Sequence, residues 1–287
     1  MPFGHGSVRH EKFLKIPKKL FSKSFLGILS KELSMSTEVY QLFSSSKGNC
    51  CLIKNKSDIF LIDAGVSAKR IECAIRGVGL KPSDVRAVFV THEHSDHIKG
   101  LETLSRRFGM QIYAPRGCFD GILRTCPSAF PFLVPNDHGT LVELENTRIY
   151  TVRTPHDADA SVGFRIELNG EKMAYFTDIG HLSSEVVRAM SGCHRVVIES
   201  NHDIARLKSG PYPYPLKQRI LGAYGHLSNF DCAALLPHLT QYGTQRIVLA
   251  HLSEENNTPE LAYEESFARL QGKASLDVAC PDRTVEV

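Results

Sequence analysis

Residues 91–97 constrain this chain more than any other feature, because they read Thr-His-Glu-His-Ser-Asp-His. Three imidazoles and a carboxylate this close together suit a tight turn, and the apolar residues just before them have the character of a buried strand. In such a turn His92 and His94 can reach one ion while Asp96 and His97 turn toward a second. Imidazole and carboxylate groups bind zinc, manganese or iron, so the segment predicts a metal site.

The composition is that of an ordinary globular protein, and 287 residues suffice for one large α/β domain or two small ones. No apolar run approaches the roughly 20 residues that span a bilayer, which argues against an integral membrane protein. The eight cysteines show no CxxC pair, so we expect free thiols and a cytoplasmic protein. The adjacent Cys50 and Cys51 are expected to pack on opposite faces of one strand.

The first 35 residues differ from the rest in charge. They hold seven Lys or Arg against two Glu, so the remaining chain has 27 basic and 29 acidic residues and a net charge of −2. We interpret residues 1–35 as a basic extension that is either disordered, a short surface helix or upstream of the true start at Met35, and residues 36–287 as the main domain. Because the domain is weakly acidic, an anionic partner must bind a local basic patch.

Alternating and apolar runs predict strands throughout the domain. They lie at residues 39–43, 51–53, 59–62, 86–90, 148–152, 163–168, 172–176, 195–199 and 246–250. The dipeptide Asn169-Gly170 predicts a hairpin turn. Helices are expected at residues 67–77, about 98–108, 185–190, 229–241 and 259–270. Ser67 and Thr258 are the predicted N-caps of two of them.

The segment Gly210-Pro-Tyr-Pro-Tyr-Pro215 is expected to be a loop, because closely spaced prolines disfavour both helix and central strand. Its tyrosines lie near several cations in the sequence. The segment is therefore either a clamp for substrate or a structural connection. Any nucleic-acid groove is expected near Lys47, Lys208, Lys217 and Arg219.

Four more potential ligands follow predicted strands, as a metal centre at one edge of a sheet requires. Asp63 and His251 end apolar runs, while His156 and Asp178 lie just beyond two others. Each alone is a weak signal, since a single strand-end aspartate is usually a turn former. Their shared position at strand ends makes a joint site the better interpretation.

These five motifs in this order resemble the metallo-β-lactamase-fold hydrolases over about residues 37–252. The resemblance implies an α/β fold, an αββα four-layer sandwich of two mixed sheets with helices outside. It also implies two divalent ions, zinc or manganese with iron admitted, sharing a bridging hydroxide as nucleophile. By position, one ion is held by His92, His94 and His156, the other by Asp96, His97 and His251, with Asp178 bridging. Asp63 then orients a ligand histidine.

Three further segments resemble the YycJ/WalJ-like exonuclease group of that superfamily. They are residues 44–50, 199–203 and 225–229. The resemblance implies a 5′-to-3′ exonuclease acting on the ends of double-stranded DNA. The order of Glu199, His226 and His251 is also similar to the late motifs of the β-CASP nucleases, but only about 72 residues separate Asp178 from His251, too few for their inserted domain.

Asp96, His226 and Glu199 are the candidate catalytic residues. His226 is expected to contact phosphate or protonate the leaving oxygen, with Glu199 holding its imidazole in the useful tautomer; the alternative is a histidine with no catalytic role. His202 and Asp203 are expected to support the site from behind. The loop residues Ser45, Ser46, Lys47 and Asn49 are predicted substrate contacts, although a strained turn explains the same loop.

Other functions remain open at this point. A hydrolase of a small phosphodiester or of a thioester, as in glyoxalase II, uses the same ligands, and a non-catalytic metal-bound scaffold belongs to a third class. The sequence leaves open the metal, the choice of DNA or RNA, the direction of degradation and the oligomeric state.

Overall fold

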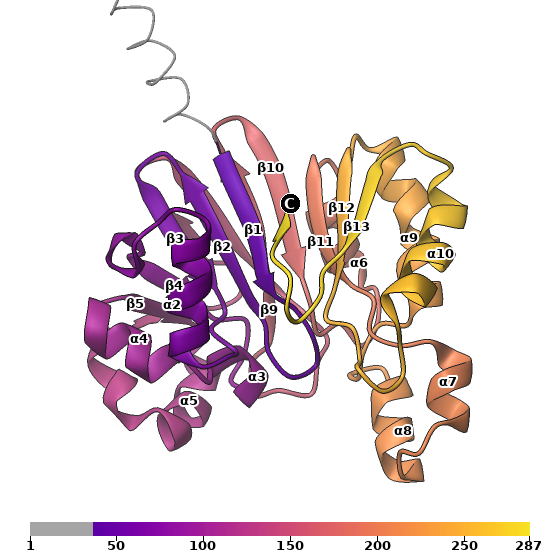
Figure 1. Ribbon diagram of the computed structural model, residues 1–287, viewed down its shortest axis with the longest axis horizontal. Coiled ribbons are helices and arrows are strands. Elements are labelled where there is room, and N and C mark those ends of the chain that lie inside the picture. Colours follow the sequence, from indigo (N-terminus) through magenta and orange to yellow (C-terminus); the bar gives the residue numbers. More distant parts are fainter. Residues whose placement is uncertain (1–36) are drawn as a thin grey trace, which may run out of the picture. The chain divides into compact units, whose positions relative to one another are not determined.

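The computed structural model describes residues 37–287, which form one unit of two seven-stranded sheets with helices on their outer faces (Figure 1). The prediction for residues 1–35 lies outside the described residues. Within residues 37–287, no helix is long and apolar enough to cross a membrane.

The first sheet has the order β14-β1-β2-β3-β4-β5-β6. Its strands are β1 (Thr37–Phe43), β2 (Cys50–Asn55), β3 (Asp58–Ile62), β4 (Ala87–Phe89), β5 (Gln111–Ala114), β6 (Leu133–Pro135) and β14 (Val285–Glu286). Strands β1 to β3 are antiparallel, whereas β3 to β6 run parallel. The helices α2 (Ala68–Gly77), α4 (Leu101–Phe108) and α5 (Phe119–Thr125) belong to this half, together with the short α3 (Ser95–Ile98).

The second sheet repeats the scheme with the order β13-β12-β11-β10-β9-β8-β7. Its strands are β7 (Leu141–Glu143), β8 (Thr147–Arg153), β9 (Val162–Leu168), β10 (Glu171–Phe176), β11 (Arg195–Glu199), β12 (Arg246–Ala250) and β13 (Ser275–Val278). Strands β7 to β10 are antiparallel and β10 to β13 are parallel. Its helices are α6 (Ser184–Met190), α7 (Ile204–Ser209), α8 (Tyr214–Leu221), α9 (Asn229–Gln241) and α10 (Pro259–Leu270).

Three apolar clusters join the layers. The middle cluster takes side chains from both sheets, among them Phe60, Phe89 and Phe164. The outer clusters lie between each sheet and its own helices. Cys50 belongs to an outer cluster and Cys51 to the middle one, so their predicted packing on opposite faces is confirmed. The predicted αββα sandwich of two mixed sheets is likewise confirmed.

All nine predicted strands are present with end shifts of at most two residues, and the Asn169-Gly170 turn joins β9 to β10. Ser67 is the N-cap of α2, as predicted, although its side chain makes no capping hydrogen bond. Two local predictions were wrong. The helix expected at about 98–108 begins only at Leu101, because the short α3 ends at Ile98 and Gly100 stands at the N-cap of α4.

The second wrong prediction concerns the Pro-rich segment, whose last two residues are helical. Helix α8 begins at Tyr214, with Pro213 at its N-cap and Pro215 in its first turn. Proline is tolerated there because the first helical N–H groups have no partner within the helix. The prolines thus start a helix instead of preventing one.

Candidate metal centre

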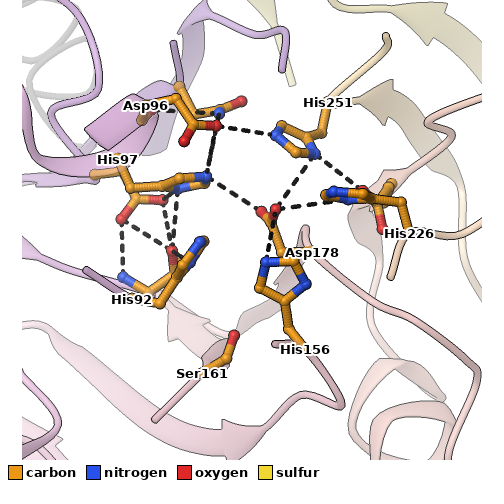
Figure 2. A network of polar contacts seen from close by, with 12 residues as sticks. His92, Asp96, His97, His156, Ser161, Asp178, His226 and His251 are labelled. Atoms are coloured by element: carbon orange, nitrogen blue, oxygen red, sulfur yellow. Dashed lines mark hydrogen bonds and ion pairs between the residues drawn. The ribbon is translucent and has the colours of Figure 1, made fainter. Parts of the chain in front are cut away.

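Most of the candidate ligands follow parallel strands of the two sheets, while His156 follows the antiparallel strand β8. The first sheet supplies Asp63 after β3 and the 92–97 segment after β4. The second sheet supplies Asp178, Glu199 and His251, which lie at the ends of β10, β11 and β12, next to one another in that sheet. Figure 2 shows the side chains of Asp96, His97, Asp178 and His251 converging on one space.

Three of these strand-end residues have a left-handed backbone. The φ angles of Asp63, Asp178 and His251 are 59°, 57° and 56°. Such angles are uncommon for residues other than glycine and cost of order 1–3 kcal/mol each when the residue is poorly suited to them. At each of these positions the chain turns sharply where its strand stops.

The histidines and aspartates form overlapping groups in which one atom of each residue lies within 4.8 Å of the others. The groups are His92, His94 and His156; Asp96, His97 and His251; His92, His97 and Asp178; and Asp178, Glu199, His226 and His251. The first two groups are the two sets that the sequence predicted. Asp178 lies between them, with Oδ2 at 3.3 Å from Nε2 of His97 and Oδ1 at 3.6 Å from Nε2 of His156.

Several polar atoms of this cluster suit a bound cation. Nε2 of His92, Nε2 of His156 and Oδ2 of Asp178 are buried and have no hydrogen-bond partner among the described residues. Unpaired buried polar atoms are rare and costly, so three that converge on one space point to a ligand they share. With imidazole and carboxylate donors only, the residues fit divalent metal ions.

The electrostatics of the chain also favour a cation. Burial acts to lower the pKa of His251, but the carboxylates of Asp178, Asp96 and Glu199 overcome it and raise that pKa to about 10. Burial likewise opposes the rise in the pKa of His97, which Asp178 and Asp96 hold well above its usual range. Positive charge is therefore stabilised at this position.

Asp63 holds His97 from behind. Its Oδ2 lies 2.8 Å from Nδ1 of His97, and its Oδ1 accepts a hydrogen bond from the backbone N–H of Thr91 at 2.8 Å. Both side chains are fully buried. The contact leaves Nε2 of His97 directed at the cluster (Figure 2). Thr91, which the sequence analysis did not single out, also lies 3.1 Å from Nδ1 of His92 through its hydroxyl oxygen.

Glu199, from the second sheet, holds two histidines through Nδ1 in the way that Asp63 holds His97. Oε1 lies 2.7 Å from Nδ1 of His226 and 2.9 Å from Nδ1 of His251. Oε2 accepts hydrogen bonds from the backbone N–H groups of Ile179 and Leu227 at 2.7 and 3.0 Å. The carboxylate is fully buried and uses both oxygens, so it positions two imidazoles.

Two other predicted site residues, Asp203 and His202, lie outside the ligand groups. Asp203 caps α7 by accepting a hydrogen bond from the N–H of Arg206 at 2.7 Å, and His202 is buried with neither ring nitrogen partnered among the described residues. Asp203 therefore supports a helix start, not a ligand.

The predicted substrate loop divides into two parts. Ser45 and Asn49 are buried within the loop, and Nδ2 of Asn49 donates to the Ser45 carbonyl at 3.0 Å and lies 3.3 Å from Nε2 of His97. Ser46 and Lys47 instead line cavities, with Lys47 paired to Glu254.

Part of the candidate ligand cluster lines a cavity of about 340 Å³. The cavity is lined by Ser46, His94, Ser95, Asp96, Asp178, Arg219, His226 and His251. Of the four cations expected to form a groove, Arg219 alone lines this cavity. Lys217 is turned away and donates to the carbonyls of Lys208 and Gly210, at 2.8 and 2.7 Å.

Comparison with known proteins agrees with this geometry. Residues 59–252 match the family described as the beta-lactamase superfamily domain. The chain belongs to the beta-lactamase superfamily. The exodeoxyribonuclease WalJ of Streptococcus pneumoniae is 34% identical over 228 residues, covering 77% of this chain and 84% of that protein. The exodeoxyribonuclease YycJ of Bacillus anthracis is 35% identical over 225 residues, with the same coverage.

Solved structures show the same superfamily fold at low identity. The metallo-beta-lactamase fold protein YhfI from Bacillus subtilis superposes with a TM-score of 0.67 at 14% identity, covering 88% of this chain and 99% of that chain. The short form of human tRNase Z gives a TM-score of 0.59 at 18% identity, covering 86% and 98%. As a superfamily member with a converging set of metal ligands, the chain is a metal-dependent hydrolase.

Proposed function

We propose that this chain is a dinuclear-metal exonuclease that degrades double-stranded DNA from its 5′ ends. The observation that carries the proposal is the pair of ligand groups on either side of Asp178, since a carboxylate between two groups suits two adjacent ions. The relatives named exodeoxyribonuclease, of which the alignments cover 84%, support DNA as the substrate.

Two divalent ions in this site would supply an activated water and neutralise the charge that develops on the phosphate. Asp178 would hold them together, and the remaining ligands would fix their positions from the two sheets. Oδ2 of Asp96 lies 3.3 Å from Nε2 of His97 and 3.4 Å from Nε2 of His251. The Asp96 side chain is 21% exposed, so its substitution would remove a ligand at the edge of the core and not within it.

His226 is the residue best placed to act on the leaving group. Its side chain is 20% exposed and lines the metal cavity, whereas His97, His156 and His251 are almost fully buried. With Nδ1 held by Glu199, its Nε2 is free to contact phosphate or to donate a proton to the leaving oxygen.

A cleavage time course on labelled DNA tests the proposal. Linear duplexes labelled at the 5′ or the 3′ end are incubated with wild-type protein in zinc and in manganese, with Asp96→Ala as the control and single-stranded DNA and RNA as competing substrates. The expected result is stepwise release of 5′-terminal nucleotides by the wild type alone. Absence of cleavage in both metals, with metal content confirmed, overturns the nuclease assignment.

We further propose that the protein works in the cytoplasm, where DNA is available to it. All eight cysteines are free, in keeping with a reducing compartment.

A further inference from the structure

Apolar side chains from helix α8 and from the segment before it line a cavity. None of the residues of α8 is buried. Leu216 and Ile220 lie four residues apart, a spacing that puts both on the same side of the helix. Tyr212 lies before the helix begins, and all three side chains are half-buried. The three side chains line a cavity of about 280 Å³.

This cavity adjoins the metal centre. It shares Ser46, Arg219 and His226 with the cavity that contains the metal ligands. His226 therefore lines two cavities, one that contains candidate metal ligands and one that is partly apolar. A molecule in the second cavity would lie directly beside the reacting phosphate.

Arg219 and Lys47 are the cationic side chains that line the second cavity. Arg219 is held by Asp157, which accepts hydrogen bonds from its Nε and, at 3.1 Å, from its Nη2. The N–H groups of its Nη1 have no hydrogen-bond partner among the described residues, so they remain for an anion. Lys47 is paired with Glu254 and is less available.

We propose that this cavity binds the terminal nucleotide of the DNA strand. The base would pack on Tyr212, Leu216 and Ile220, while Arg219 would contact a phosphate shared with the metal centre. Asp157 is then a positioning residue that holds the guanidinium at the mouth of both cavities. The inference rests on the proposed function and adds a physical cause for cleavage at ends.

The cavity is small and has an aromatic lining. At about 280 Å³ it lies just below the range of about 300–1,000 Å³ that is usual for small-molecule sites, so it has room for little more than one nucleotide. An aromatic ring beside aliphatic side chains accepts any base, because every base has a flat face that can stack. On this proposal the cavity binds one terminal nucleotide and does not select a sequence.

Calorimetric binding of 5′-dAMP to the manganese-loaded protein tests this inference without depending on cleavage. Inorganic phosphate and deoxyadenosine serve as the two half-ligands. Leu216→Trp fills the cavity, and Gln218→Trp adds the same ring to α8 at an exposed position that does not line it. Arg219→Gln removes the cation. Metal content and DNA cleavage are measured for every protein.

We expect 5′-dAMP to bind wild type and Gln218→Trp at least about tenfold more tightly than either half-ligand. Leu216→Trp should lose this advantage and Arg219→Gln most of it, both with unchanged metal content. The inference is overturned if 5′-dAMP binds no better than phosphate, or if Leu216→Trp binds it like the wild type. Since cleavage is scored separately, a wild type that degrades DNA but fails the binding test refutes the nucleotide site alone. A wild type that binds 5′-dAMP as expected but leaves DNA intact refutes the nuclease function.

Discussion

His226 and Glu199 are joined by a contact of 2.7 Å between Nδ1 and Oε1. Burial alone would raise the pKa of Glu199, but His226 and His251 hold it far below its usual range, so the side chain is an ionised acceptor. Nδ1 of His226 must then carry the hydrogen. This contact selects the tautomer of His226 and leaves Nε2 toward the cavity.

The first prediction concerns the role of that imidazole. His226→Gln should lower the rate of DNA cleavage by about 10²–10⁴-fold, the usual contribution of a positioned acid or base. Metal content, measured by elemental analysis, should stay at the wild-type value. A variant that loses bound metal would show instead that His226 is a ligand, as its place in one of the ligand groups allows.

The second prediction concerns the role of Asp63 in metal binding. Asp63→Asn keeps the size of the side chain, and asparagine tolerates the left-handed backbone at this position, where φ is 59°. The charged contact with His97 is lost, so metal affinity should fall by about 10–100-fold. Competition with a chelator measures the affinity. An Asp63→Asn protein that binds metal as tightly as wild type contradicts the assigned role.

The third prediction uses the close approach of two loops. A Cβ at Gly65 would lie 1.6 Å from the carbonyl oxygen of Asp96, so Gly65→Ala must displace the backbone that carries Asp96. We expect weakened metal binding and a loss of about 2 kcal/mol or more in the free energy of unfolding. Gly77→Ala is the matched control, because nothing lies within 4 Å of a Cβ there. Equal effects of the two substitutions would exclude a local cause.

The fourth prediction concerns pH and stability. Burial, with a smaller contribution from His226, lowers the pKa of His202 to about 4 despite the opposing effect of Glu199. Between about pH 6.5 and 4 the unfolded chain therefore binds the extra proton, and the folded state loses up to about 3 kcal/mol as the pH falls through this window. Above pH 6.5 the imidazole is neutral in both states, so this loss of stability is absent.

Denaturant unfolding in chelator at pH 7 and pH 5 checks this. His202→Leu should reduce the difference in unfolding free energy between the two pH values, because the titrating group is gone. At pH 7 the substitution should cost little, since neither ring nitrogen of His202 has a partner among the described residues. If the difference in unfolding free energy between pH 7 and pH 5 is unchanged, a group other than His202 takes up the proton.

Much of the ligand set was predictable because it follows strands. Asp178 and His251 stand directly beyond apolar runs, and parallel strands bring their carboxyl ends to one edge of a sheet. In the 92–97 segment, three histidines and Asp96 lie so close together in the sequence that they indicate a metal site. The convergence of these residues could thus be inferred from local patterns together with one rule of sheet geometry.

Contacts between distant segments were not predictable in the same way. The pairing of Arg219 with Asp157 joins residues 62 positions apart, and nothing near either residue marks it. Asn49 looked like a substrate contact because its loop is rich in serine and glycine, yet it is fully buried. Helix α8 was hidden by its prolines, which disfavour a helix interior but suit its first turn.

The arrangement of ligands across both sheets has a consequence for the newly made chain. His251 follows β12, which lies next to the edge strand β13 of the second sheet, and more than half of the chain separates it from His92. Domains fold while the ribosome is still extending the chain at about 5–20 residues per second. Strands β1 to β6 can emerge with His92, His94 and Asp96 long before His251 is synthesised, whereas β14 of the same sheet is made after it. The ligand set of the proposed nuclease is therefore incomplete until synthesis has passed His251.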